Sequence, residues 1–286
     1  MNTGVQAGTG YTEAQIVAGQ STLTHVTSDL TIATPGTTIS HQWISGCIAI
    51  DANNVTIKDS LVTPNGHTCS GGAHNSASSA INNGDIGSPS TPTGTVIENV
   101  TVDAGPSQGP GTGGDTFGIS LASGQCLRCD SFGFAKDFWL DGTASNPALL
   151  QDSYAPSLEA CTPVATCTHM DSVFLDSSTY VTIEHSYIIA TNGGNNTTAA
   201  VDAQQDWGPI DHVKLDSSYV EGISGVDVEW SCGATHSSIT NNAFSNDSKF
   251  PRVPIDYYNT NAGDVWSANH IAETGARFPD PSPTTC

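Results

Sequence analysis

Cations are scarce in this chain, and their scarcity excludes several kinds of partner. The 286 residues contain 7 Lys+Arg against 28 Asp+Glu, which gives a formal net charge of −21 at pH 7. A surface with so few cations repels phosphate backbones and anionic lipid head groups. We therefore expect no nucleic-acid partner and no binding to anionic membranes. The acidity by itself indicates no more than solubility.

Long apolar runs and helical periodicity are also missing. No stretch is long and apolar enough to cross a bilayer, so the sequence predicts no membrane insertion. The N-terminus has neither the basic region nor the apolar region of a signal peptide. Apolar residues, 37% of the total, occur in short bursts among Gly, Ser, Thr, Asn and Asp. This pattern is typical of a turn-rich all-β protein, and the recurring apolar anchors argue against disorder.

Eight cysteines are present, and their even number indicates disulfides and an oxidising compartment. We therefore expect a secreted, extracellular protein in its mature form, with its signal peptide removed. Proximity along the chain favours the bridges Cys47–Cys69 and Cys161–Cys167, and Cys232 could then hold the terminal Cys286. Cys126 and Cys129 have the spacing of a zinc-ligand pair, but no second pair of suitable spacing follows. Disulfides are thus favoured over zinc, and a bridge between these two cysteines stays open.

A short phrase recurs along the chain. It reads apolar, polar, then Asp, Asn, His or Ser, then a small residue, then apolar or aromatic. The copies begin at residues 57, 97, 127, 150, 183 and 215, with looser copies at 239 and 266. Their spacing of about 23 to 40 residues lies in the range of solenoid repeats. Alternation within each copy predicts a strand with one buried face.

A second short alternating run precedes most copies of the phrase. These runs lie at 47–51, 117–121, 138–141, 173–176, 199–202, 226–229 and 255–258. Repeated coils of at least two strands predict an all-β right-handed parallel β-helix of about eight coils. We expect one domain over 1–286, with 1–40 as an N-terminal cap region and 276–286 as a C-terminal strap. The interior should contain Ile57, Ile97, Leu150, Ile183, Leu215 and Ile239.

Through this repeat, roughly residues 30–275 resemble the secreted bacterial right-handed parallel β-helix proteins of the pectate-lyase-like superfamily. Most characterised members cleave or bind polysaccharides along one face of the stack, so the resemblance implies an extracellular polysaccharide as the partner. The chain lacks the Asp-Asp, Gly-His-Gly and Arg-x-Lys motifs of polygalacturonase-type hydrolases. Pectate lyases use a basic residue to abstract a proton, and cations are few here. The branch is therefore not identified, and no family residue carries over.

Stacking the upstream runs predicts a face that could bind a glycan. The residues expected to point inward are Ile50, Leu121, Leu140, Val201 and Val228. One outward column then comprises Trp139, Phe174, Asp202, Glu229 and Tyr258. A second comprises Asp137, Ser172, Ala200, Asp227 and Asp256. Aromatic rings stack on sugar rings while carboxylates bond hydroxyls or transfer protons, so this face is our candidate groove.

The carboxylates of this face are the candidate catalytic residues. One coil apart they would lie about 5 Å from each other, and two coils apart about 10 Å. These separations approach those of retaining and inverting glycosidases. Asp202 with Glu229, or Asp202 with Asp256, are therefore the pairs to test, with Asp227 as a further candidate. A solvated acidic face is the alternative.

Four other residues are singled out. His169 and Asp171 could supply a general base or metal ligands, although a capping turn also explains a His-x-Asp. Trp207 lies in an insertion at 206–210, where it could form a wall of the site or cover the edge of the core. His185 lies at the Asp/Asn position of the phrase and is expected to be structural.

Three functions remain open at this point. The leading hypothesis is a glycoside hydrolase that uses paired carboxylates and requires no cofactor. The first alternative is a polysaccharide lyase that holds Ca²⁺ on the acidic face and uses Lys136 or His169 as base. The second is a non-catalytic glycan-binding or structural solenoid.

Overall fold

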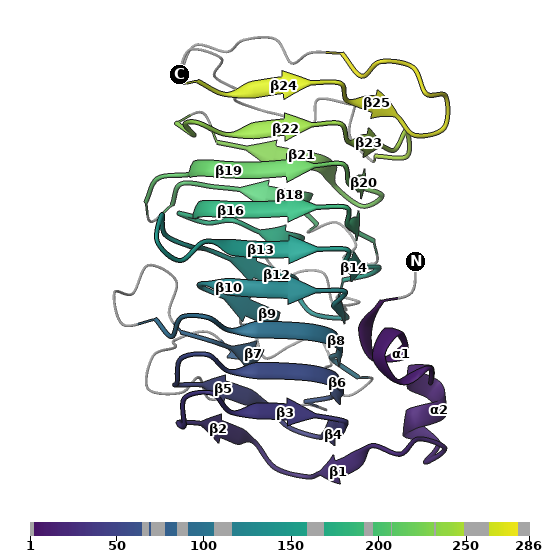
Figure 1. The fold of residues 1–286 in the computed structure, drawn as a ribbon. Coiled ribbons are helices and arrows are strands. Elements are labelled where there is room, and N and C mark those ends of the chain that lie inside the picture. The colour runs from purple at the N-terminus through teal and green to yellow at the C-terminus, as the bar shows by residue number, and fades with distance from the viewer. Residues whose placement is uncertain are drawn as a thin grey trace.

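The computed structural model describes residues 3–64, 69, 78–84, 91–105, 116–158, 169–191, 197–206, 208–231, 233–248 and 263–279. The chain winds as a right-handed parallel β-helix, with its first coils at one end of the stack and its last coils at the other (Figure 1). Strands of successive coils pair in parallel, as the recurring phrase predicts. The predicted fold class is confirmed.

One strand of each of eight coils joins an eight-stranded sheet, which contains the predicted upstream runs from 47–51 to 226–229. The last predicted run, 255–258, lies outside the described residues. Its strands are β2 (Leu30–Ile32), β5 (Ile48–Ile50), β7 (Ser78–Asn82), β9 (Thr116–Leu121), β12 (Lys136–Leu140), β15 (Asp171–Phe174), β18 (Ala199–Ala203) and β21 (Val226–Trp230). The residues expected to point inward from it are at most 1% exposed: Ile50, Leu121, Leu140, Val201 and Val228. Their alternation with the first outward column was read correctly from the sequence.

The other strands form a 17-stranded sheet of two rows, which share β6 (Thr56–Val62) and β8 (Val96–Asp103). The first row also contains β3 (Thr38–Ser40), β10 (Gly124–Leu127), β13 (Ala148–Gln151), β16 (Thr179–Glu184), β19 (Asp211–Asp216), β22 (Ser238–Thr240) and β24 (Val265–Ser267). The second row also contains β1 (Thr24–Val26), β4 (Gln42–Ile44), β11 (Asp130–Phe132), β14 (Tyr154–Ala155), β17 (Tyr187–Ile189), β20 (Tyr219–Glu221), β23 (Ala243–Phe244) and β25 (His270–Ile271).

The interior of the coils is one continuous apolar core. All six residues predicted to line it are fully buried: Ile57, Ile97, Leu150, Ile183, Leu215 and Ile239. In the first row they stack in register, for example Leu150 on Ile183 and Ile183 on Leu215. Each coil buries the first apolar residue of its copy of the phrase. The same pattern therefore recurs along the sequence as a visible repeat.

A bend in the backbone divides most copies of the phrase, which are therefore not single continuous strands. The bending residue has a φ of 50–60° in all eight copies, namely Asp59, Asn99, Arg128, Asp152, His185, Ser217, Asn241 and Ala268. Asn and Asp tolerate this left-handed conformation better than most residues. The Asp/Asn/His/Ser position of the phrase is thus a turn position, and His185 is structural as expected.

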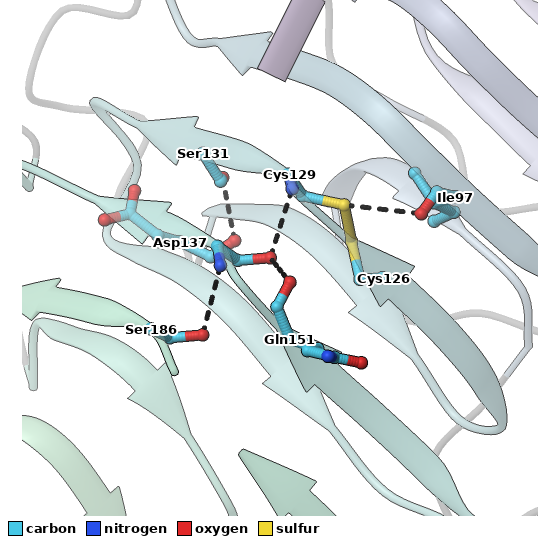
Figure 2. Close-up of a disulfide and its surroundings, with 8 residues drawn as sticks. Ile97, Cys126, Cys129, Ser131, Asp137, Gln151 and Ser186 are labelled. Atoms are coloured by element: carbon cyan, nitrogen blue, oxygen red, sulfur yellow. Dashed lines mark hydrogen bonds between the residues drawn. A yellow bond between two sulfur atoms is a disulfide. The ribbon is translucent and has the colours of Figure 1, made fainter. Parts of the chain in front are cut away.

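The residue after the bend forms a ladder between coils. Its side-chain oxygen accepts a hydrogen bond from a backbone N–H of the preceding coil: Gln42 to Ser60 (3.2 Å), Cys129 to Ser153 (3.1 Å), Ser153 to Ser186 (3.2 Å), Ser186 to Ser218 (3.1 Å), Ser218 to Asn242 (3.0 Å) and Asn242 to Asn269 (2.9 Å). Figure 2 shows the steps at Cys129 and Ser186. These bonds satisfy backbone donors that the turn would otherwise leave buried without an acceptor.

The N-terminal segment differs from the expected cap. Helices α1 (Gly4–Thr9) and α2 (Glu13–Val17) lie along one side of the stack, where α1 contacts β6 and β8 (Figure 1). Val5 and Ile16 pack on Leu61 in a small apolar cluster of their own. Residues from Thr24 onward already form strands of the first coils. No helix within the described ranges is long and apolar enough to span a bilayer.

Of the predicted C-terminal strap, only the first residues are described. Phe278 is 2% exposed, and its ring lies 5.1 Å from that of Phe244 and 6.1 Å from that of Trp266. This ring therefore covers the apolar interior at the last coil.

Two disulfides are formed among the described residues. Cys47 bonds to Cys69, as predicted, and Cys126 bonds to Cys129, which the sequence left open (Figure 2). No described cysteine is free. The other predicted bridges, Cys161–Cys167 and Cys232–Cys286, lie outside the described residues.

Candidate functional site

The first outward column of the eight-stranded sheet forms in the predicted register. Trp139 pairs with Phe174, Phe174 with Asp202, and Asp202 with Glu229, each on the next strand. The structure therefore brings four of the five residues of this column together. The fifth, Tyr258, lies outside the described residues.

The exposure of this column differs from the expectation. Asp202 is fully buried, and Trp139 and Phe174 are only 7% exposed, while Glu229 is partly exposed. Trp139 and Phe174 join Phe117 in a separate apolar cluster, with the rings of Phe117 and Trp139 stacked at 4.6 Å. The expected solvent-facing groove is thus wrong at Asp202, because the rings on this face pack against one another.

Lys136 lies on the same face, at the start of β12. It is 2% exposed, and its Nζ donates a hydrogen bond of 2.9 Å to the backbone oxygen of His169. The ammonium group also lies 4.7 Å from the ring centre of Phe174 and 5.6 Å from that of Phe117. Such contacts compensate in part for the loss of water around a buried cation.

His169 and Asp171 contribute to this face in different ways. The side chain of His169 is exposed, so its contact with Lys136 is made by its backbone. Asp171 is fully buried, and its Oδ1 accepts a hydrogen bond of 3.1 Å from the backbone N–H of Ala199 on the next coil. The pair is therefore not a solvent-facing acid–base couple.

Asp202 is the electrostatically unusual residue of the face. Neither of its carboxylate oxygens has a hydrogen-bond partner among the described residues. Burial, followed by the charges of Asp171 and Glu229, raises the pKa of Asp202 well above its ordinary value, and Lys136 only partly opposes this. Because an ionised buried carboxylate is costly without partners, the protonated form of Asp202 is favoured.

The second outward column was predicted wrongly. In the pairing of β12 with β15, Lys136 lies opposite Asp171 and Phe138 lies opposite Val173. The residues between them, Asp137 and Ser172, are not paired. The pairings of β7 with β9 and of β18 with β21 pass over the same position. Ala200 accordingly lies in the main core. A local break in the pairing of β7, β9, β12, β15, β18 and β21 therefore reverses the face of this column.

Two polar residues of this second column, Ser172 and Asp227, have structural partners. The Oγ of Ser172 donates to the backbone oxygen of Ile189 on β17. Asp227 is 2% exposed, and its Oδ1 accepts hydrogen bonds of 2.7 Å from the N–H of Gly222 and from the Oγ of Ser248. Burial raises the pKa of Asp227 to about 6. Asp227 thus braces a turn and is withdrawn as a catalytic candidate.

Two further predicted site residues, Trp207 and Asp256, lie outside the described residues. Within the described ranges, the ligand atoms of Asp171, Asp202 and Glu229 do not all lie within 4.8 Å of one another. Ca²⁺ takes six to eight oxygens at 2.3–2.6 Å, so these three carboxylates alone form no ready cage.

A groove of about 500 Å³ lies elsewhere on the stack, where the eight-stranded sheet gives way to the first row. It is lined by Thr91, Thr93, Ala122, Ser123, Asp141, Gly142, Thr143, Ser145, Asn146, Ser177 and Thr179. Its carboxylate, Asp141, accepts a hydrogen bond of 2.8 Å from the N–H of Thr179. None of the predicted site residues lines this groove, since it is formed by turns rather than by strands.

Comparisons with known proteins leave the chain without an assigned family. No family model matches it, and no curated protein does. One solved structure, of a mannuronic-acid-specific polysaccharide lyase of family 6 from the human gut microbiota, aligns with 86% of this chain and 80% of its own. The TM-score is 0.27 and the sequence identity is 10%. The function proposed below therefore rests on the geometry of this chain alone.

Proposed function

We propose that this protein is an extracellular polysaccharide-cleaving enzyme, and that it is a glycoside hydrolase acting through Asp202 and Glu229. The observation that supports this is their register on neighbouring strands, with Asp202 fully buried and its pKa raised by that burial. Two carboxyl groups whose environments separate their pKa values can divide the roles of acid and base between them. No cofactor is required for this chemistry.

The proposed reaction has two steps. Asp202 donates its proton to the glycosidic oxygen while the Glu229 carboxylate attacks the anomeric carbon, which breaks the glycosidic bond and forms a glycosyl ester. Water, deprotonated by the Asp202 carboxylate, then cleaves the ester and restores both groups. Neighbouring parallel strands are about 4.8 Å apart, which suits the separation of roughly 5 Å in retaining enzymes. Glu229 is the partly exposed member of the pair, so the sugar would approach from its side.

A panel of neutral and uronic polysaccharides tests this proposal. We expect new reducing ends, without the ultraviolet absorption of unsaturated sugars, from at least one neutral glycan. Asp202→Asn should lower the rate by about 100-fold or more, because a positioned general acid contributes 10²–10⁴-fold. Glu229→Gln should do the same, and a small anion such as azide should restore part of its activity by replacing the missing nucleophile.

Asp152→Asn is a matched control, because Asp152 is a partly exposed carboxylate at a turn of the other sheet. It should leave the rate unchanged. The hydrolase proposal fails if Asp202→Asn and Glu229→Gln both keep full activity on a cleaved glycan. It also fails if the panel is bound but not cleaved, which would leave a glycan-binding or structural solenoid.

Lys136 supports a second candidate function, a polysaccharide lyase. Its buried ammonium group lies beside Phe174 and within electrostatic reach of Asp202. In its uncharged amine form, a lysine in such a site is a known type of general base. Its Nζ would take the proton next to a uronate carboxylate, and the bond to the leaving glycosidic oxygen would break as the double bond forms, with Ca²⁺ neutralising that carboxylate. This candidate predicts unsaturated, ultraviolet-absorbing products, loss of activity in Lys136→Met and inhibition by a chelator.

A further inference from the structure

Stacking of the last coils brings together two histidines and an aspartate outside the candidate active site. Asp211 and His212 begin β19, and His236 lies two residues before β22 on the next coil. The two histidines are 24 residues apart in sequence, yet their rings stack with centroids 4.8 Å apart. One turn of the solenoid therefore builds a group that no local motif reveals.

The ligand-capable atoms of the three residues converge. Nδ1 of His212 lies 2.7 Å from Oδ2 of Asp211, and Nδ1 of His236 lies 2.9 Å from Oδ1. All the ligand atoms of the trio lie within 4.8 Å of one another, and this is the one such group of three within the described ranges. Both imidazoles thus direct the same ring nitrogen to one carboxylate.

The rings are held in place by their neighbours along the stack. Tyr180 stacks on His212 at 4.6 Å with an interplanar angle of 11°. On the other side, Gly263 of the next coil leaves His236 uncovered, and the side chain of His236 is 60% exposed. One side of the trio is therefore fixed by an aromatic ring, and the other is open to solvent.

Two more side chains support the trio. The Oγ1 of Thr235 donates a hydrogen bond of 2.6 Å to Oδ1 of Asp211, which orients the carboxylate. Asp264, 9% exposed, is within electrostatic reach of both His236 and Asp211. Its Oδ1 accepts from the N–H of Ser237, while its buried Oδ2 has no hydrogen-bond partner among the described residues. A buried carboxylate with one oxygen left without a hydrogen-bond partner favours a cation nearby.

We propose that Asp211, His212 and His236 form a binding site for a divalent first-row transition metal ion, with Zn²⁺ as the best-suited common ion. Two imidazole nitrogens and one carboxylate are donors that Zn²⁺ accepts, whereas Ca²⁺ and Mg²⁺ prefer oxygen ligands alone. Binding replaces the nitrogen–oxygen hydrogen bonds with coordinate bonds and releases protons. Three protein ligands leave a fourth, solvent-facing position for water or an incoming ligand.

Titration calorimetry of the full chain, stripped with a chelator, tests the site with ZnCl₂ as the probe. We expect saturable binding, with CaCl₂ giving no competing signal at this site. His236→Ala and His212→Ala should each weaken binding by about tenfold or more, because even partners in the outer coordination shell are worth 10- to 100-fold. Co²⁺ should give visible absorption bands of a low-coordinate site in the wild type, and these should vanish in the double variant.

His185→Ala is the matched control. His185 lies at a left-handed turn and faces one carboxylate, with its Nδ1 4.0 Å from Oδ1 of Asp152, but it has no second imidazole. Its substitution should leave Zn²⁺ binding unchanged, which separates the trio from weak surface coordination. Melting temperatures without metal establish that each variant is folded. Equal Zn²⁺ affinity in the wild type and in the folded double variant would overturn the proposal and leave the trio as a hydrogen-bonded structural cluster.

Discussion

The Nζ of Lys136 lies 2.9 Å from the backbone oxygen of His169, and the two residues are on neighbouring coils. This bond holds a buried cation at the centre of the outer face of the eight-stranded sheet. Asp171 and Asp202 lie on the same face, and Lys136 is the positive charge that acts against their mutual repulsion at Asp202. Removing it should therefore affect both folding and the ionisation of the face.

Lys136→Met tests the energetic importance of this cation. We expect the free energy of unfolding at pH 7 to fall by about 3 kcal/mol, since loss of one member of a buried charged group typically costs 3–5 kcal/mol. Urea denaturation followed by circular dichroism measures the change. Lys214→Met is the control, because the side chain of Lys214 is 41% exposed and its pairs with Glu184 and Asp216 lie at the surface. It should cost less than about 1 kcal/mol.

Asp202→Asn should change stability in a pH-dependent way. The pKa of Asp202 is raised in the folded protein above its ordinary value of 3.8 by burial and by Asp171 and Glu229. Folding therefore favours the protonated form of Asp202. The stability that this preference contributes is complete below about pH 3.8, and it is lost as the pH rises through the pKa of Asp202 in the folded protein. The variant stays neutral, so it should unfold at higher urea than the wild type at pH 8.

At pH 4 the urea midpoints of Asp202→Asn and the wild type should converge. A variant less stable than the wild type at pH 8 would mean that the ionised carboxylate has favourable partners, contrary to our assignment. We expect Asp202 to reduce the stability of the protein at pH 8. Catalytic residues commonly reduce stability in this way, because activity can require a destabilised site.

Ser186→Ala tests the ladder between coils. The Oγ of Ser186 accepts from the N–H of Ser153 and donates to the backbone oxygen of Glu184. Its loss leaves a buried N–H without an acceptor, which should lower the free energy of unfolding by about 1–3 kcal/mol. Thermal denaturation measures it, with the exposed Ser145→Ala expected to stay within about 0.5 kcal/mol. No difference between these two variants would show that the ladder adds nothing to stability.

The two observed disulfides should differ in their contributions. The bridge between Cys47 and Cys69 closes a separation of 22 residues, whereas that between Cys126 and Cys129 spans only 3. Replacing the first pair with alanine should cost about 2–4 kcal/mol, and replacing the second clearly less, because a bridge restricts the unfolded chain more when its loop is longer. The denatured, unreduced wild type should show close to zero free thiols. Four or more would contradict the oxidised state expected for all eight cysteines.

Local alternation in the sequence was sufficient to predict the solenoid and its interior. Ile57, Leu150 and Ile183 occupy equivalent places because each coil must bury the same position against its neighbours, and a period of two is visible within five residues. The register of Trp139, Phe174, Asp202 and Glu229 also followed, since aligning the coils by their buried residues aligns the outer residues as well. Short-range periodicity was therefore sufficient to predict the fold and the alignment of one column of the candidate site.

Three features were decided only by the tertiary structure. The burial of Asp202 depends on the neighbouring coils on either side of it, and the reversed face of Asp227 depends on a break in strand pairing that recurs from β7 to β21. The convergence of His212 and His236 on Asp211 depends on the number of residues in one coil. Exposure, breaks in strand pairing and contacts between coils are properties of the stack as a whole, because they arise from neighbours that lie one or more turns away in sequence. Periodicity identifies which residues share a column, but only the assembled coils determine which of them meet solvent and which meet one another.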